Sequence, residues 1–165
     1  MPDILHRVGM QGSPAKVYDA IATTKGLSHW WITGTTGETS VGGLVKVRPE
    51  KGRSQGHDED GFDMRVIESK PGEVVRWQCE GGPPEWIGTQ LTFRLLEKGN
   101  ETYVLFTHAG WKDPVEFMHH CSTKWAVFLM SLKNWIEREE GRPHPYDVKI
   151  HPRDGGRPRP IRACR

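Results

Sequence analysis

The sequence places two histidines directly before a cysteine, at His119, His120 and Cys121, and all three are residue types that bind zinc. The segment around them has helical periodicity, and successive side chains of a helix point about 100° apart. Cys121 therefore faces the apolar side of the helix, whereas the two histidines point away from it in different directions. Because zinc ligands must face one point, we predict that this run holds no metal ion.

Other patterns that would indicate a cation site or an enzyme are also weak. The acidic run at residues 57–60 lacks the length and spacing of a calcium-binding loop, and we interpret it as a solvated charge run. The sequence contains no phosphate-binding GxxxxGKS/T, no zincin HExxH and no dinucleotide-binding GxGxxG. We therefore expect no cofactor, no metal and no catalytic residue, although the sequence alone leaves an enzymatic activity open.

His108 is the polar residue whose position most suggests contact with a ligand. Residues 101–109 alternate between apolar and polar side chains, which predicts a strand with His108 on its inward face. An inward imidazole can orient the polar end of a ligand or act as a general acid or base, but it can also simply bond a backbone carbonyl. A catalytic role would need a carboxylate, and Glu68 and Glu85 are the candidates that the sequence offers.

The composition is that of one soluble globular domain. The chain has 165 residues, of which 35% are hydrophobic, and this length suffices to bury a sizeable core. No apolar run approaches the ~20 residues of a membrane-spanning helix, and the first residues lack the pattern of a secretion signal. The three cysteines are far apart, which argues against a disulfide framework. We therefore expect a cytoplasmic protein.

Charge is distributed unevenly between the body of the chain and its end. Residues 1–141 carry a net charge of −3, whereas residues 142–165 carry +5 and are rich in proline and arginine. We therefore expect a folded domain over residues 1–141 and a flexible or surface-docked tail over residues 142–165. The tail contains a single aromatic residue, so we expect no nucleic-acid partner. Its residues 146–151 could alternatively add a strand to a neighbouring chain.

Hydrophobic periodicity predicts the elements that would position these residues. Strand-like alternation is found over residues 4–10, 44–48, 62–69, 73–80, 87–98 and 101–109. Short turns join the last four of these runs, which indicates an antiparallel meander. Ser13-Pro14 predicts a helix start, since a serine side chain can cap free backbone N–H groups and proline is tolerated in the first turn. A second short helix is expected over residues 24–31.

The second half of the chain contains one long amphipathic helix. Apolar residues recur at intervals of three and four, at Met118, Cys121, Trp125, Phe128, Leu132 and Trp135. Asp113-Pro114 predicts its start, with the aspartate as the N-cap, and we expect the helix to end near Gly141. We predict that this apolar stripe packs on one face of the meander, with coiled-coil pairing as the alternative.

The order of these elements and several sequence segments resemble a known family. The segments are SPAKVYDAIATTKGLSHWW, VGG at residues 41–43, VVRWQ, TQLTFRL, ETYVLFTHAGW and KWAVFLMSLKNWIEREEG, and the similarity spans about residues 3–141. They resemble the activator of heat-shock protein 90 ATPase homologue-like family, within the START-related or SRPBCC superfamily. The resemblance implies an α+β helix-grip (START-like) fold, with a curved antiparallel sheet wrapped around a long C-terminal helix and two short helices after the first strand. It also implies a cavity between sheet and helix, which holds an apolar molecule in many relatives.

The predicted sheet and helix would bring a set of apolar and aromatic side chains to the space between them. The candidate ligand-binding residues are Trp30, Met64, Trp77, Phe93, Phe106, His108, Phe117, Met118, Cys121, Trp125 and Phe128. Such a wall suits a flat apolar ligand, but the same side chains could instead fill one another's space. Adjacent Trp30 and Trp31 cannot share a helix face, so we expect one in the core and the other at the rim.

These observations suggest three functions, which we rank. The first is non-catalytic binding of a hydrophobic or aromatic small molecule in the cavity between the sheet and the C-terminal helix. The second is a cyclase or hydratase type of enzyme that uses the same cavity, with His108 as its acid or base. The third is co-chaperone-like activity, which the family name suggests. We expect a monomer or homodimer that does not insert into membranes.

Overall fold

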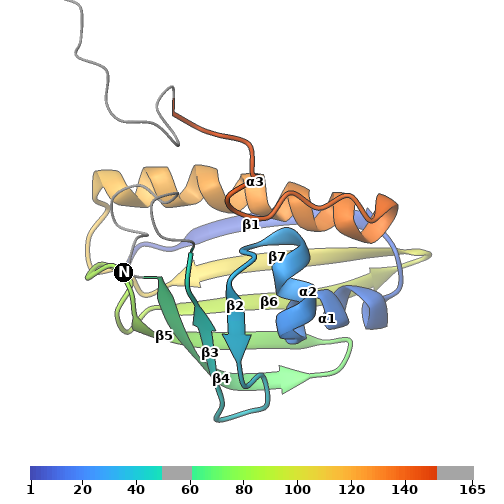
Figure 1. Cartoon of the computed structure of the whole chain (residues 1–165), viewed down its shortest axis with the longest axis horizontal. Helices are drawn as coiled ribbons and strands as arrows, with labels where there is room; N and C mark the ends of the chain where they lie inside the picture. The colour runs from blue at the N-terminus through green and yellow to red at the C-terminus, as the bar shows by residue number, and fades with distance from the viewer. Residues whose placement is uncertain (50–60, 152–165) are drawn as a thin grey trace, which may run out of the picture.

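The strands of the chain form one antiparallel sheet, and the long helix lies across it (Figure 1). The structure is a computed structural model that describes residues 1–49 and 61–151. The predicted charge run at residues 57–60 and the last part of the predicted tail, residues 152–165, lie outside the described residues. The elements are β1 (Ile4–Gln11), α1 (Pro14–Ala22), α2 (Thr24–Trp30), β2 (Thr35–Gly37), β3 (Leu44–Val47), β4 (Phe62–Lys70), β5 (Val74–Gly81), β6 (Gln90–Lys98), β7 (Glu101–Ala109) and α3 (Glu116–Arg138).

The sheet curves around α3. Its strand order is β1-β7-β6-β5-β4-β3-β2, and every neighbouring pair is antiparallel. Register shifts in β4, between Asp63 and Met64 and between Val66 and Glu68, mark bulges that bend a strand and increase its twist. Helices α1 and α2 contact both the sheet and α3 (Figure 1). The predicted α+β helix-grip fold is confirmed.

Period-two alternation identifies the inner face of the meander correctly. The inward side chains of β4 to β7 are buried, and they are Met64, Val66, Trp77, Cys79, Leu91, Phe93, Leu95, Val104, Phe106 and His108. The largest difference in a strand boundary is that β6 begins at Gln90 and not at residue 87. Gly88 has a φ of +83° and its N–H donates to Cys79 O at 2.9 Å, so residues 86–89 form a turn that precedes the strand.

Both short helices begin after a residue whose side chain caps them, and the cap of α1 is the predicted Ser13. Ser13 Oγ accepts a hydrogen bond from Lys16 N at 3.2 Å, and Pro14 occupies the first helical position of α1. Thr23 ends α1 and caps α2, because its Oγ1 accepts from Gly26 N at 3.0 Å. The buried face of α1 consists of Val17, Ala20 and Ile21.

Helix α3 buries the predicted stripe but starts later than predicted. The N-cap position is Val115, without a side-chain cap, so the prediction of Asp113 as the cap is wrong. Asp113 O instead accepts from Val115 N at 2.9 Å, and this backbone turn delays the helix until Glu116. The buried residues of α3 are Cys121, Trp125, Phe128, Leu129, Ser131, Leu132 and Ile136, with Met118 and Trp135 partly buried beside them.

Residues 142–151, which we call the strap, run back along α3 toward its N-terminal half (Figure 1). Glu139 adopts the left-handed conformation that ends α3. His144 then bonds the segment after α2 on both sides: its N–H donates to Trp31 O at 2.7 Å, and its O accepts from Thr33 N at 3.2 Å. Further along, the fully buried carboxylate of Asp147 accepts from Lys124 and Lys149.

The packing of α2 on α1 predicts the effect of one substitution. A Cβ at Gly26 would lie 2.5 Å from Asp19 O and 2.6 Å from the Cα of Ala20. Alanine ordinarily stabilises a helix interior by about 0.5–1 kcal/mol relative to glycine. Here we expect Gly26→Ala to lower the free energy of unfolding by about 1–3 kcal/mol, because the helices must move apart. Urea denaturation measures this, and the exposed Lys25→Ala in the same helix is the control. A Gly26→Ala variant as stable as the wild type would contradict the close packing.

The strap predicts a pH-dependent contribution to stability. Burial would raise the pKa of Asp147, but hydrogen bonds from His144, Lys124 and Lys149 outweigh it and hold the pKa well below its usual range. A lowered pKa stabilises the fold fully above the unfolded-state pKa, about 3.9, and this stabilisation is lost as the pH falls below that value. We expect Asp147→Asn to lower the unfolding free energy by about 2 kcal/mol at pH 7. The difference from wild type should shrink at pH 3, and an equal difference at both pH values would contradict the assignment.

Candidate functional site

The interior between sheet and α3 is filled by aromatic rings. Phe93 lies 5.2 Å from Trp77 and 5.1 Å from Phe106, and Phe106 lies 4.5 Å from Trp125, as distances between ring centroids. Trp30 is also buried, and its Nε1 donates to Ala20 O at 2.8 Å. Most of the side chains predicted to line a cavity therefore pack against one another in the core.

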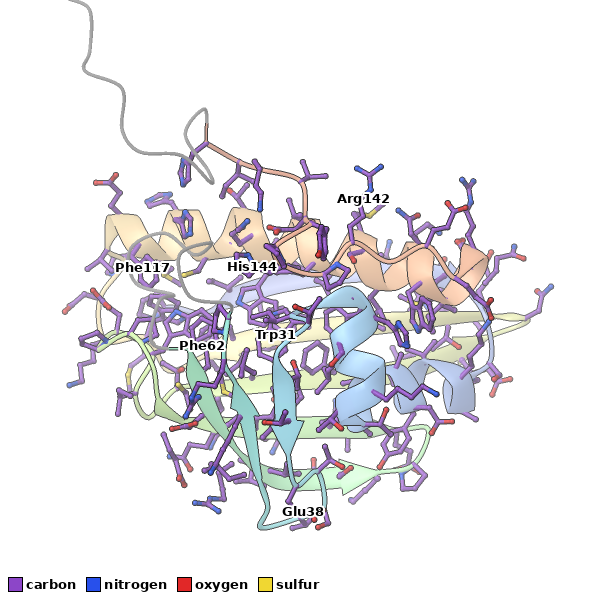
Figure 2. All side chains as sticks on the ribbon, in the orientation of Figure 1. Trp31, Glu38, Phe62, Phe117, Arg142 and His144 are labelled. Carbon is purple, nitrogen blue, oxygen red and sulfur yellow. The ribbon has the colours of Figure 1, made fainter. Side chains whose placement is uncertain are left out.

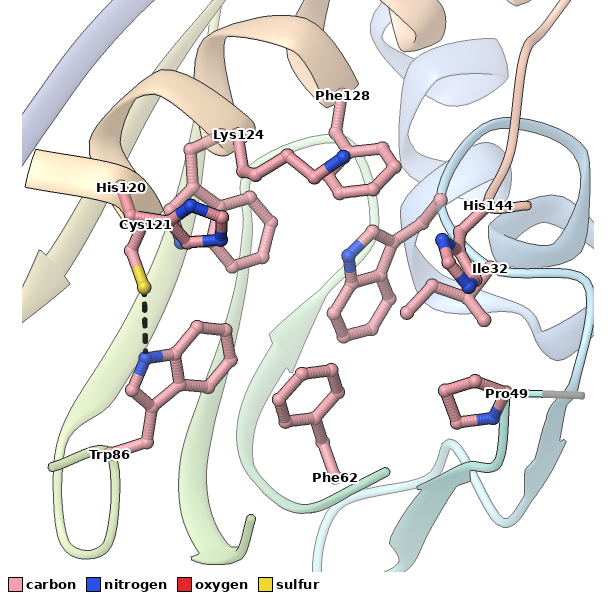
Figure 3. Close-up of a pocket in the computed structure, with 11 residues that line it drawn as sticks. Ile32, Pro49, Phe62, Trp86, His120, Cys121, Lys124, Phe128 and His144 are labelled. Atoms are coloured by element: carbon pink, nitrogen blue, oxygen red, sulfur yellow. Dashed lines mark hydrogen bonds between the residues drawn. The ribbon is translucent and has the colours of Figure 1, made fainter. Parts of the chain in front are cut away.

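A pocket remains where this interior meets the surface, beside the N-terminal half of α3 (Figure 3). It consists of a cavity of about 40 Å³ that opens into a depression of the surface. Its lining residues are Trp31, Ile32, Pro49, Phe62, Trp86, His120, Cys121, Lys124, Trp125, Phe128 and His144. Figure 2 shows Trp31 and Phe62 beneath α3 with His144 close to them.

Three of the predicted lining residues reach this pocket, and they are Cys121, Trp125 and Phe128. The others do not line it: Trp30, Met64, Trp77, Phe93, Phe106 and His108 are buried in the core, and Phe117 and Met118 are partly buried on α3. The expectation that one tryptophan of the pair lies at the rim is wrong, because Trp30 and Trp31 are both buried in the core, although Trp31 also lines the pocket. Phe117 packs against Trp111, with ring centroids 6.2 Å apart.

The walls of the pocket are nearly parallel rings. Phe62 stacks on Trp86 with centroids 4.6 Å apart and planes 17° apart, and on Trp31 at 6.2 Å and 13°. Trp125 stands 6.0 Å from Trp86 and 5.6 Å from Trp31, with planes inclined by 20° and 26°. Offset stacking of this kind adds an orientation preference to apolar contact. The pocket is therefore suited to a flat apolar group.

Trp86 is one of the wall residues that the sequence analysis missed, and a local turn fixes its position. Trp86 N donates to Pro83 O at 2.9 Å, and Thr89 Oγ1 donates to Trp86 O at 2.6 Å. The indole Nε1 then points to Cys121 Sγ at 3.4 Å (Figure 3). Its only sequence signal is a tryptophan between the turn-forming run GGPP and Gly88, which does not predict where the side chain points.

His108 is engaged in the core and is kept neutral. Trp125 Nε1 donates to His108 Nδ1 at 3.3 Å, so Nε2 carries the proton and donates to Thr89 Oγ1 at 2.8 Å. Burial lowers the pKa of the His108 imidazole to about 3. Both nitrogens thus have partners, and neither partner is a carboxylate.

The two carboxylates considered as partners of His108 are elsewhere. Glu68 lies 3.7 Å from Arg76 in an ion pair. Glu85 Oε2 is buried without a hydrogen-bond partner among the described residues, and Glu85 lines a different depression together with Trp111. The arrangement of these groups offers no acid–base pair at His108.

The polar rim of the pocket consists of Lys124, His120 and His144. The Lys124 ammonium is bonded to Asp147, so its charge is balanced by the strap. His120 Nδ1 lies 3.0 Å from His151 Nε2, and the two rings are parallel within 5°. Among residues 1–49 and 61–151, no three His, Cys, Asp or Glu side chains are placed to hold a metal ion. Within the same residues, no helix is long and apolar enough to cross a membrane.

Comparisons with known proteins agree with this fold. Residues 11–137 match the family model described as "Activator of Hsp90 ATPase homolog 1-like protein". The structure is similar to the solution structure of the Aha1 dimer from Colwellia psychrerythraea, with 41% identity and a TM-score of 0.75, over 86% of this chain and 100% of that one. A comparison with curated proteins gives no match.

More distant structures share the fold alone. Protein SSP2350 from Staphylococcus saprophyticus has 15% identity and a TM-score of 0.69, over 86% of this chain and 97% of its own. CalU16 from Micromonospora echinospora has 20% identity and a TM-score of 0.63, over 84% of this chain and 75% of its own. The resemblance noted in the sequence is thus confirmed, and the chain belongs to the family of activator of Hsp90 ATPase homolog 1-like proteins.

Proposed function

We propose that the protein binds a small, flat apolar or aromatic molecule in the pocket beside α3, without catalysing a reaction on it. The observation that carries the proposal is the set of nearly parallel rings of Trp31, Phe62, Trp86 and Trp125 that line the pocket. A flat molecule stacked there would gain about 25 cal/mol per Å² of apolar surface removed from water, together with stacking.

The size of the pocket supports a small ligand. A cavity of about 40 Å³ admits only one edge of an aromatic molecule, so the rest of such a ligand would lie in the open depression around the cavity. The ligand would therefore enter by an edge and lie against the rings that line the pocket. The side chains of Trp77, Phe93 and Phe106 would support these walls from below and would not touch the ligand.

The surroundings of His108 favour a binding role for the protein over a catalytic one. A general acid or base works best with a pKa near the working pH, and burial places that of His108 far below it. Its Nδ1 accepts from Trp125, so protonation there would break a core hydrogen bond. We therefore infer that His108 holds the Trp125 indole in position by accepting its hydrogen bond.

The proposal includes a cytoplasmic location and a monomeric or homodimeric state. Cys79 and Cys121 are free and buried, which suits a reducing compartment. The similar Colwellia protein is described as a dimer. Sedimentation equilibrium of the full chain would distinguish the two states.

Binding can be tested with 2-methoxynaphthalene, a neutral flat probe without a hydrogen-bond donor. We expect the indole N–H resonances of Trp31, Trp86 and Trp125 to shift in ¹H–¹⁵N spectra on addition of the probe, and that of Trp30 to stay in place. Trp86→Leu should weaken binding by about five- to tenfold in calorimetry, because it removes one stacking wall. Trp135→Leu is the matched control, since Trp135 stacks on His29 and does not line the pocket.

Two results would contradict the proposal. One is the absence of any shift at millimolar probe in the folded wild-type protein. The other is equal weakening by Trp86→Leu and Trp135→Leu, with both variants shown to be folded by circular dichroism.

A further inference from the structure

We propose that His144 determines the specificity of this pocket by accepting a hydrogen bond from the ligand, which is therefore an aromatic molecule with a hydroxyl group, of the phenol class. The inference rests on the proposed function, because it concerns a ligand of the same pocket. The ligand must then carry a hydrogen-bond donor, in addition to the flat shape that the aromatic rings select.

The strap holds His144 against the pocket wall. Its backbone is bonded to Trp31 O and Thr33 N, so the residue forms a parallel bridge opposite Ile32. Figure 3 shows the His144 ring beside Ile32. The family match ends at residue 137, so this part of the wall comes from a segment beyond the matched region.

One ring nitrogen of His144 has a partner and the other does not. Nδ1 lies 3.4 Å from Asp147 Oδ1, and a carboxylate can only accept, so Nδ1 carries the proton of the neutral ring. Nε2 is then an acceptor, and it is buried without a hydrogen-bond partner among the described residues. The side chain as a whole is 13% exposed, so bulk water does not readily replace the missing donor.

The position of Asp147 makes this tautomer stable. Its carboxylate is fully buried and is also bonded to Lys124 and Lys149, so it stays charged and fixed. An uncompensated buried acceptor costs free energy, which a ligand donor would recover. A hydroxyl on the edge of a flat aromatic molecule can supply that donor while the ring stacks on the aromatic walls.

The polar groups of Trp86, Trp125 and Lys124 do not compete for this role. The indole N–H of Trp86 is directed to Cys121 Sγ, and that of Trp125 is bonded to His108. The Lys124 ammonium is bonded to Asp147. Nε2 of His144 is thus an acceptor without a partner, on a residue that lines the pocket beside the engaged indole donors of Trp86 and Trp125.

The test compares 2-naphthol with 2-methoxynaphthalene, which have the same ring system but differ in the donor. Affinities are measured by calorimetry for the full-length wild type, His144→Phe, His144→Gln and the control His29→Phe. His29 stacks on Trp135 and does not line the pocket. We expect the ratio of the two affinities, in favour of 2-naphthol, to fall about fivefold in His144→Phe. The ratio should be partly retained in His144→Gln, whose amide oxygen can accept, and unchanged in His29→Phe.

A second measurement does not depend on any variant folding. The ¹⁵N resonance of His144 Nε2 in the wild type should move toward lower frequency on addition of 2-naphthol and stay in place with 2-methoxynaphthalene. Two results would overturn the role of His144 while leaving pocket binding intact. One is an unchanged affinity ratio in folded His144→Phe, and the other is an Nε2 resonance that does not shift when 2-naphthol is added. Failure of both probes to bind would instead overturn the proposed function, and this inference with it.

Discussion

The burial of the Trp125 indole is the constraint on which both the interior and the pocket depend. An indole carries one N–H group, which must find an acceptor when it is buried. Here the acceptor is His108 Nδ1, and it can accept because burial keeps the imidazole neutral. The other nitrogen must then donate to Thr89, whose own hydroxyl proton goes to Trp86 O. One chain of hydrogen bonds therefore ties the middle of α3 to the turn that carries Trp86.

This series of hydrogen bonds fixes two walls of the pocket. It also uses both ring nitrogens of His108. It holds the rings of Trp86 and Trp125 with their planes 20° apart. A proton added to His108 Nδ1 would remove the acceptor of the Trp125 N–H and leave a buried donor unpaired, at a cost of about 1–3 kcal/mol. Packing thus requires that His108 Nδ1 stay unprotonated, whereas proton transfer would require it to take up a proton. The hydrogen bond from Trp125 is the arrangement that packing requires.

Regular periodicity could identify the core but not the pocket. Alternation placed Phe106 inside because every second residue of a strand faces the same way. Trp86 lies in a turn, where no period applies, and His144 reaches the pocket only because the chain reverses after α3. The start of α3 was mispredicted because the capping pattern at Asp113 competes with a backbone turn that takes the same residues. These positions depend on contacts between segments far apart in the sequence, which local patterns do not contain.

The pocket consists of two parts that are held in place by different forces. The aromatic walls belong to the core, where the burial of large rings dominates. The strap instead docks through the backbone of His144 and the carboxylate of Asp147, while Tyr146 and Val148 are 63% and 52% exposed. A segment that buries little apolar surface opens at a lower free energy than the core beneath it. The shape of the pocket and its hydrogen-bonding character are therefore determined separately. A substitution in the strap changes the polar group that His144 presents, whereas the stacked rings, and with them the preference for flat molecules, are retained.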